Sequence, residues 1–452
     1  STVTPGTITA NGDPTASTDS PFDDPAGFKF GENGDQNVIK TGSYVGDGST
    51  DQDVFLGWEP QWLMVKRTDV AKDWYIWDSM RGIVSGGNDA ELAANLSNAE
   101  ASAEKIELTS TGFKLKSASS TVNASGGTWI YIAIRRPDGY CGKLPELGTG
   151  VFTMDTGAGS ATIPGFDSNF PVGFALVRNP ATGMSWETCA RLIQGKNLMT
   201  NTNAAETTYG ASDFTFDSNV GWLSDSGYGS QYQSWMWKRH AGFDVVTYKG
   251  DHVDNRTIPH SLGKTPEMIW TKNRGSTENW VVWHSGMPNS GDGENATGHM
   301  LLNLNNATAH AGGIYGGTDA VAPTSTHWSV GTHETINDDN YNYISMLFAS
   351  VDGISKVGSY TGNGSATERT ITLGFQPRFL IVKNSSGTGN WLVLDTTRGW
   401  GSGNENELYL DGDWASNSDT NDGAPTSTGF TLTTTNSNVN TNNSTYIYYA
   451  HA

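Results

Sequence analysis

The chain has 452 residues, with 27 Lys or Arg against 47 Asp or Glu, and its formal net charge is −20. An acidic chain without a basic patch is a poor match to nucleic-acid phosphates, and no apolar run approaches the roughly 18 residues of a membrane-spanning helix, so we expect neither nucleic-acid binding nor membrane insertion. Two cysteines, Cys141 and Cys189, exclude a disulfide scaffold and a CxxC metal site, and leave either one bridge or two separate thiols.

The N-terminal segment, residues 1–36, differs from the rest of the chain. Its prolines, separated by Asp, Ser and Thr, predict an extended arm. Phe22, Phe28 and Phe30 are candidate assembly anchors, because an extended segment can add a strand to an exposed sheet edge. Phe28 and Phe30 would then share one face of that strand. A flexible linker to an upstream region is the alternative interpretation.

One phrase of sequence recurs four times after the arm. It combines a Gly-rich turn, a proline, a short apolar run and a tryptophan, and its second copy is the weakest. A self-similar period defines an array, and units of about 100 residues are large enough to bury their own cores. The matching prolines are Pro60, Pro171, Pro266 and Pro377. We therefore expect β repeats at 37–143, 144–241, 242–352 and 353–452.

Short runs that mix aromatic and β-branched residues with polar ones indicate strands, and the Gly, Asn, Asp and Ser clusters between them indicate turns. The best helical candidate, residues 89–103, is interpreted as a strand with a loop or at most one short helix. The composition of 55 Gly with 16 Trp, 16 Tyr and 16 Phe agrees with many turns and small cores filled by rings. The predicted fold class is all-β, with four tandem β-sandwich-like units and an extended N-terminal arm.

Recurrent aromatic residues are candidates for the cores of the repeats. Trp74, Trp280 and Trp391 follow the same turn and are expected to be equivalent core rings. Each repeat also closes on an aromatic strand, where side chains two positions apart share a face and either pack inward or form an outward platform. These pairs are Trp129/Tyr131, Trp235/Trp237, Tyr341/Tyr343 and Tyr446/Tyr448.

Candidate catalytic groups do not recur as a reactive set. Asp78 and Asp395 occupy matching positions and are followed by Arg81 and Arg398, and this recurrence favours a structural Asp–Arg pair over a catalytic pair. We therefore expect no enzymatic activity, although paired carboxylates for glycoside cleavage can meet in space without any sequence motif.

An acidic loop at 411–422 offers a candidate metal site. Asp411, Asp413, Asp419 and Asp422 supply hard oxygen ligands at short spacing, which suits Ca²⁺. The alternate-ligand spacing of a calcium-binding loop is not met, so a solvated acidic turn is the competing interpretation.

Exposed rings would suit a sugar ligand, because aromatic faces stack on the apolar faces of sugars. Trp58, Trp222, Trp235, Trp328 and Trp414 are the tryptophans considered for this role. Trp222 and Trp414 lie in less repeated, loop-like segments and are the better ligand-binding candidates.

The segments 258–269, 322–326 and 357–364, with the middle phrase repeated at 424–430, resemble a tandem module of virion proteins from marine tailed phages. The resemblance extends from about Val38 to the end of the chain and is weakest at 144–241. It implies an extracellular virion surface component, such as a tail fibre, a tail-associated adhesin or a capsid-attached protein. Its partners would be other virion proteins, and the resemblance brings no catalytic residues.

Our leading hypothesis is a non-enzymatic phage virion structural protein that forms a homo-oligomer or multi-copy assembly and can contribute to host attachment. One alternative is an adhesin that binds a host-surface glycan through exposed aromatic residues. Another is a polysaccharide depolymerase.

Overall fold

The computed structural model describes residues 28–30, 38–79, 81–83, 87–136, 141–143, 147–209, 213–216, 218–225, 227–239, 241–287, 298–310 and 313–452, with backbone only for 28–30, 141–143 and 419. Strands make up 42% of the structure and helices 3%, which confirms the all-β prediction. Among the described residues, no helix has the length and apolar character needed to cross a membrane.

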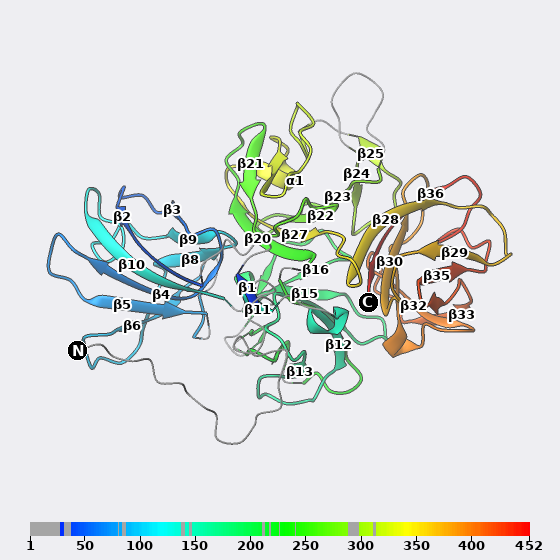
Figure 1. The fold of residues 1–452 in the computed structure, drawn as a ribbon, viewed down its shortest axis with the longest axis horizontal. Coiled ribbons are helices and arrows are strands. Elements are labelled where there is room, and N and C mark those ends of the chain that lie inside the picture. Colours follow the sequence, from blue (N-terminus) through cyan, green and yellow to red (C-terminus); the bar gives the residue numbers. More distant parts are fainter. Residues whose placement is uncertain are drawn as a thin grey trace, which may run out of the picture.

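Four six-stranded antiparallel sheets share one strand order (Figure 1). In each, the first strand of a unit pairs with the last, the last pairs with the third, and the fourth, fifth and sixth strands follow in sequence. The chain is therefore a tandem repeat. We call the segments from β2 to β10, from β12 to β19, from β20 to β27 and from β28 to β36 units 1, 2, 3 and 4.

Units 1 and 2 each combine a large sheet with a small one. The large sheet of unit 1 contains β2 (Ile39–Val45), β10 (Thr128–Arg135), β4 (Pro60–Arg67), β5 (Trp74–Asp78), β6 (Asp89–Ala93) and β7 (Ala101–Ala103), and its small sheet contains β3 (Gln52–Phe55), β9 (Gly112–Leu115) and β8 (Ile106–Thr109). The large sheet of unit 2 contains β12 (Phe152–Thr156), β19 (Gln233–Trp237), β14 (Phe174–Arg178), β15 (Glu187–Ala190), β16 (Lys196–Met199) and β17 (Thr207–Thr208), and its small sheet contains β13 (Phe166–Asp167) and β18 (Gly221–Trp222).

Units 3 and 4 repeat this arrangement. The sheets of unit 3 contain β20 (Phe243–Lys249), β27 (Asn342–Phe348), β22 (Met268–Asn273), β23 (Val281–His284), β24 (Gly298–Leu301) and β25 (Ala309–His310), then β21 (Arg256–Pro259) and β26 (His327–Val330). Those of unit 4 contain β28 (Ser355–Thr361), β36 (Thr445–His451), β30 (Phe379–Asn384), β31 (Leu392–Asp395), β32 (Glu405–Tyr409) and β33 (Asn417–Thr420), then β29 (Arg369–Thr372), β35 (Gly429–Leu432) and β34 (Pro425–Thr426).

Helical segments are short and lie at the ends of strands. They are α1 (Glu334–Asn337) and the 3₁₀ turns η2 (Gly148–Gly150), η3 (Arg191–Ile193) and η4 (Thr396–Arg398). Residues 89–103 form β6 and β7 joined by a loop, in agreement with the first interpretation of that segment. β1 (Phe28–Phe30) pairs with β11 (Cys141–Lys143) outside the four large sheets.

The core of each sandwich lies between the large and the small sheet. In three units a first-strand tyrosine crosses this core and donates its hydroxyl to a backbone carbonyl oxygen, which satisfies the one polar atom of a buried ring. The pairs are Tyr44 to Val122 at 2.8 Å, Tyr248 to Ile336 at 2.7 Å and Tyr360 to Val439 at 2.7 Å.

The turn before the fourth strand is built in the same way in all four units. The backbone N–H of a tryptophan donates to the side-chain oxygen of an Asn or Asp that follows the fifth strand. The pairs are Trp74 with Asn95 at 2.9 Å, Trp186 with Asn201 at 3.1 Å, Trp280 with Asn303 at 3.0 Å and Trp391 with Asp411 at 2.8 Å. The expected Asp–Arg pairs are also structural, since Arg81 bonds Asp78 at 2.7 Å and Arg398 bonds Asp395 at 2.6 Å.

Units 2, 3 and 4 pack the outer faces of their large sheets against one another and form a closed triangle (Figure 1). The contacts are cyclic, because the repeated tryptophan of each unit donates its indole N–H to the last residue of the fifth strand of the next unit. The bonds run from Trp186 to Tyr409 O at 2.6 Å, from Trp391 to Leu301 O at 2.9 Å and from Trp280 to Met199 O at 2.9 Å.

Aromatic side chains fill the centre of the triangle. The Trp237 ring lies 6.0 Å from that of Phe243 in unit 3 and 5.6 Å from that of Phe379 in unit 4, and the Phe348 ring lies 4.8 Å from that of Tyr449, measured between centroids. All five rings are buried. Units 2 to 4 therefore share a common core in addition to the separate cores expected for units of about 100 residues.

The aromatic pair of unit 2 faces the triangle rather than its own sandwich. Trp235 lies opposite Leu176 in unit 2, and Ile132 lies opposite Met64 at the same position of unit 1. Trp235 therefore corresponds to Ile132. Trp235 thus does not correspond to Trp129 or Tyr131, because an odd shift along a strand reverses the face. The sequence left open whether such a pair packs inward or points outward, and the pair of unit 2 points outward from its own sandwich into the triangle.

Unit 1 lies beside the triangle (Figure 1), and buried charged groups as well as apolar side chains lie at the junction. Glu59 is 1% exposed, and its Oε1 lies 3.6 Å from Nε of Arg136 while its other oxygen pairs with Arg239. Nε of Arg239 lies 2.6 Å from Asp244 Oδ1. Two carboxylates and two guanidinium groups therefore join unit 1 to the start of unit 3.

Candidate functional site

A groove runs between unit 1 and unit 3. Its larger part has a volume of about 660 Å³ and is lined by residues that include Lys40, Phe55 and Pro259. A smaller part of about 190 Å³ shares Phe55 and Pro259 with the first and continues to Lys114 and Arg256. Volumes of this size accommodate small ligands or short segments of a polymer.

Phe55 gives the groove an apolar surface. Side chains alternate along β3, so Val54 is buried in unit 1 whereas Phe55 is 67% exposed. Nζ of Lys40 donates to the carbonyl oxygen of Leu56 at 3.1 Å and lies 5.9 Å from the centroid of the Phe55 ring. An exposed ring beside a fixed cation suits a ligand with both apolar and hydroxyl-bearing faces, such as a sugar.

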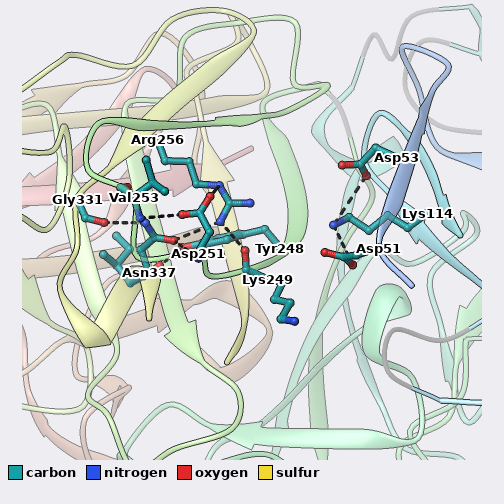
Figure 2. Close-up of polar contacts among 11 residues, drawn as sticks. Asp51, Asp53, Lys114, Tyr248, Lys249, Asp251, Val253, Arg256, Gly331 and Asn337 are labelled. Carbon is teal, nitrogen blue, oxygen red and sulfur yellow. Dashed lines mark hydrogen bonds and ion pairs between the residues drawn. The ribbon is translucent and has the colours of Figure 1, made fainter. Parts of the chain in front are cut away.

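Ion pairs line both walls of the smaller part, and Figure 2 shows them on opposite sides of the groove. On the unit 1 side, Nζ of Lys114 lies 3.4 Å from Asp51 Oδ1 and 3.8 Å from Asp53 Oδ1. On the unit 3 side, Nε of Arg256 lies 3.2 Å from Asp251 Oδ2. The groove thus presents charged hydrogen-bonding groups of both signs.

Arg256 is held in place by its neighbours (Figure 2). Its guanidinium group lies over the ring of Tyr248, 5.8 Å from the centroid, and donates to Asn337 Oδ1 at 3.2 Å. Asn337 is buried and donates through Nδ2 to the carbonyl oxygens of Val253 and Gly331, both at 2.9 Å. A guanidinium group fixed in this way loses little further entropy when a ligand binds.

The charge of Asp51 is stable around neutral pH. Burial opposes its charged form, but Lys114 and Lys116 outweigh burial and lower the pKa of Asp51. Nζ of Lys116 lies 3.1 Å from Asp51 Oδ1. A carboxylate held ionised by two ammonium groups is suited to accept hydrogen bonds and poorly suited to supply a proton.

The two tryptophans singled out as ligand-binding residues have opposite environments. Trp222 is fully buried, and its indole N–H donates to Ser234 Oγ at 3.0 Å, so its ring has no face open to a ligand. This corrects the expectation of an exposed ring, because β18 places Trp222 in the core of unit 2. Trp414 is 55% exposed and lies edge-on to Tyr409, and it does not line the groove. Of the other tryptophans considered, Trp58, Trp235 and Trp328 are buried.

The acidic loop does not bring its four aspartates together. Asp411 accepts from the backbone of Trp391, in the place that asparagine takes in the other three units. Asp413 is exposed, and the side chain of Asp419 lies outside the described residues. Asp422 is buried next to β32 instead. The expected four-aspartate Ca²⁺ loop is therefore corrected, because one of its members is a turn residue and another belongs to a different cluster.

Asp422 meets two glutamates of β32. Ligand oxygens of Glu405, Glu407 and Asp422 all lie within 4.8 Å of one another, and the three side chains are buried. Burial raises the pKa of Glu405 to about 7, and burial together with the neighbouring Glu407 raises the pKa of Asp422 as well. In the described part of the chain, this is the group of acidic side chains arranged so that it could hold a metal ion.

The proposed anchors of the arm are only partly described. Phe22 lies outside the described residues, and of Phe28 and Phe30 the backbone alone is described. β1 pairs antiparallel with β11 of the same chain, with Phe28 opposite Lys143 and Phe30 opposite Cys141. This part of the arm thus adds a strand within its own chain, and attachment of the arm to another protein stays a prediction.

Cys189 is a free thiol buried in unit 2. Its Sγ lies 2.8 Å from the carbonyl oxygen of Lys196. Burial raises the pKa of Cys189 well above its usual range, so this thiol is unreactive at neutral pH.

Unit 1 exposes the sheet face that the other units bury. Ile39 of β2 is 58% exposed, and Ile130 and Ile134 of β10 are 39% and 36% exposed. Ile39 and Ile134 are paired across the sheet as Phe152 and Trp237 are in unit 2, where both rings lie at the centre of the triangle. An apolar sheet face that none of the described residues covers marks an interaction surface.

Sequence reasoning missed the groove, because Phe55, Lys114 and Arg256 meet only when units 1 and 3 lie side by side. The carboxylate cluster could have been found. Glu405 and Glu407 alternate along a strand as Asp89 and Glu91 do at the matching place in unit 1.

The fold defines an all-β protein of tandem β-sandwich repeats. The chain belongs to the family described as a domain of unknown function (DUF7483), whose model matches residues 34–136 and 180–452. The intervening stretch covers the junction to unit 2 and its first strands, in the repeat whose sequence is weakest. No curated protein matches the chain.

Proposed function

We propose that this protein is a non-enzymatic structural component of a virion surface, of tail-fibre or capsid- and tail-associated type, and that several copies assemble through unit 1. The resemblance of the repeats to phage virion modules supports the setting. The polar groups that recur between units support the absence of catalysis, since they are turn bonds and structural ion pairs. A net charge of −20 keeps an abundant surface protein soluble.

The observation that carries this proposal is the uncovered sheet face of unit 1. The side chains of Ile39, Ile130 and Ile134 expose apolar surface to water. The other three units bury the corresponding surface. Burial of apolar area contributes roughly 25 cal/mol per Å², so such a face gains free energy whenever a matching surface covers it.

The partner that fits this face is the same face of other copies. In units 2, 3 and 4 the equivalent faces cover one another in a closed cyclic arrangement. The indole N–H groups of Trp186, Trp280 and Trp391 form the hydrogen bonds between the units. Three copies of unit 1 can close in the same way, because a head-to-tail contact with the right rotation forms a ring. We therefore propose a homotrimer held by unit 1.

Sedimentation velocity on the full chain tests the assembly. We expect a trimer that becomes a monomer when Ile130→Glu and Ile134→Glu are combined, with the melting temperature of the monomer little changed because both positions are exposed there. Val220→Glu, which alters a similarly exposed apolar residue of unit 2, should leave the trimer intact. A wild-type chain that stays monomeric at all concentrations would contradict the assembly.

The virion setting needs a separate test. Antibody labelling and imaging of purified particles should place the protein on the particle surface in a copy number that is a multiple of three. Absence of the protein from particles would contradict the proposal.

A carbohydrate-binding adhesin is the second candidate, and the groove between units 1 and 3 favours it. The exposed ring of Phe55 and the fixed Lys40 and Arg256 offer the combination that sugar recognition uses. A glycan array should then show binding that Phe55→Ser abolishes and that Trp414→Ser, which alters an exposed ring outside the groove, leaves unchanged. Release of reducing ends from a bound polysaccharide would indicate a depolymerase instead.

A further inference from the structure

Matching strands of units 1 and 4 carry paired carboxylates at the same positions. β6 places Asp89 and Glu91 two residues apart on one face, and β32 places Glu405 and Glu407 in the same way. In both units the leucine that follows the second acid pairs with the middle of the fourth strand, so the two pairs correspond in register.

In unit 1 a lysine balances this pair. The backbone N–H of Lys105 donates to Asp89 Oδ2 at 2.9 Å, and its Nζ lies 2.6 Å from Glu91 Oε1. The ammonium group thus neutralises Glu91, while Asp89 accepts from the backbone N–H groups of Lys105 and Ile106, and both carboxylates are buried.

In unit 4 the same place is taken by a third acid. The backbone N–H of Asp422 donates to Glu405 Oε1 at 2.5 Å, which is the contact that Lys105 makes with Asp89. At this position unit 4 has the carboxylate of Asp422, where unit 1 has the ammonium group of Lys105. Among the described residues, none of the ion pairs includes Glu405, Glu407 or Asp422.

The three carboxylates are oriented so that one oxygen of each has no hydrogen-bond partner. These atoms are Glu405 Oε2, Glu407 Oε1 and Asp422 Oδ1, in side chains that are 0%, 1% and 2% exposed. The opposite oxygens of Glu407 and Asp422 are held by the Tyr409 hydroxyl at 2.5 Å and by Asn436 Nδ2 at 3.1 Å. Buried oxygens without donors are costly unless a cation satisfies them.

We propose that Glu405, Glu407 and Asp422 form a structural site for one divalent cation, with Ca²⁺ the species that fits best. Ca²⁺ binds oxygen at about 2.3–2.6 Å, so two ligands of one ion lie at most about 5 Å apart. The oxygens here lie within 4.8 Å of one another. The cation would take the place of the Lys105 ammonium group, and this site is independent of the proposed assembly.

Titration of the chelator-treated full chain with Tb³⁺, which substitutes for Ca²⁺ and emits when excited through a nearby tyrosine or tryptophan, tests the site directly. We expect one equivalent of Tb³⁺ to bind with emission sensitised through Tyr409, Ca²⁺ to displace it, and Ca²⁺ to raise the melting temperature by several degrees. Asp413→Asn, which alters an exposed acid of the same region, should leave all three results unchanged.

The difference between Lys105 of unit 1 and Asp422 of unit 4 supplies the most informative variant. Asp422→Lys should abolish Tb³⁺ emission and make the melting temperature independent of Ca²⁺, because the new ammonium group reproduces the arrangement of unit 1. Glu407→Gln, which keeps the side-chain shape, should weaken Tb³⁺ binding at least about tenfold while the circular dichroism spectrum stays native. Binding that survives both variants, or a wild-type chain that neither binds Tb³⁺ nor responds to Ca²⁺ because the carboxyls share protons instead, would overturn the proposal.

Discussion

Units 1 and 4 share one strand order, yet the described neighbours cover both faces of the large sheet only in unit 4. In each unit a tryptophan closes the turn before the fourth strand, with its backbone bonded to Asn95 in unit 1 and to Asp411 in unit 4. The Trp391 ring is 1% exposed and bonds Leu301 of unit 3, whereas the Trp74 ring is only half-buried. The backbone turn therefore serves the fold of every unit, while the role of the ring depends on the neighbour that covers it.

The largest expected effect separates these two rings. Trp391→Ala should lower the free energy of unfolding by about 3–5 kcal/mol, because it opens a cavity between units 3 and 4. Trp74→Ala should cost less than half as much, since that ring keeps contact with water in the folded chain. Chemical denaturation of both variants measures the difference, and equal losses would show that the ring serves the turn rather than the interface.

The second comparison concerns the two kinds of junction. Units 2 to 4 meet through rings, whereas the junction between unit 1 and the triangle adds four buried charged groups to its apolar contacts. These groups are Glu59, Arg136, Arg239 and Asp244. Glu59→Gln should cost roughly 3 kcal/mol, because it removes the buried negative charge that Arg136 and Arg239 both face. Calorimetry should then resolve a separate transition for unit 1. A single unshifted transition would show that the ion pairs do not couple the two parts.

Much of the fold was predictable from the sequence, because strand alternation and turn residues act locally. The phrase that contains Trp391 identifies a turn wherever it occurs, and the Asp395–Arg398 pair follows from recurrence alone. The role of Trp222 was not predictable, since a loop-like segment gives no periodicity from which burial can be read. Nor was the groove, whose walls come from sheets far apart in sequence. The predicted four-aspartate metal site was wrong for a related reason. Asp422 contacts Glu405 of β32 rather than the other aspartates of its loop.

Acid should destabilise unit 3 through the buried imidazole of His284. His284 lies opposite Met268, in the register in which Asp395 lies opposite Phe379, so a neutral imidazole takes the place of an ion-paired carboxylate. Burial lowers the pKa of His284 to about 4. The unfolded chain binds this proton near pH 6.5, so the stabilisation is complete above about pH 6.5 and is lost as the pH falls toward 4.

His284→Asn tests this contribution, because Asn can still accept the hydrogen bond that Gly286 N–H donates to Nδ1 at 2.8 Å. Between pH 7 and 4.5 the wild type should lose roughly 2–3 kcal/mol more than this variant. Parallel pH profiles of the two proteins would place the acid-sensitive group elsewhere.

The smallest effect isolates the cyclic hydrogen bond. Trp391→Phe keeps an aromatic ring but removes the indole N–H, which leaves the carbonyl oxygen of Leu301 without this donor. That oxygen still accepts from the backbone N–H of Leu304 at 3.4 Å, so we expect to lose only the net contribution of one hydrogen bond, about 1 kcal/mol, beyond the loss from the smaller ring. In the described part of the chain the indole N–H of Trp74 makes no hydrogen bond to another unit, so Trp74→Phe measures the effect of ring size at the matching but less buried position. The two losses should differ by at least about 1 kcal/mol. Equal losses would mean that the bonds around the triangle orient the units without stabilising them.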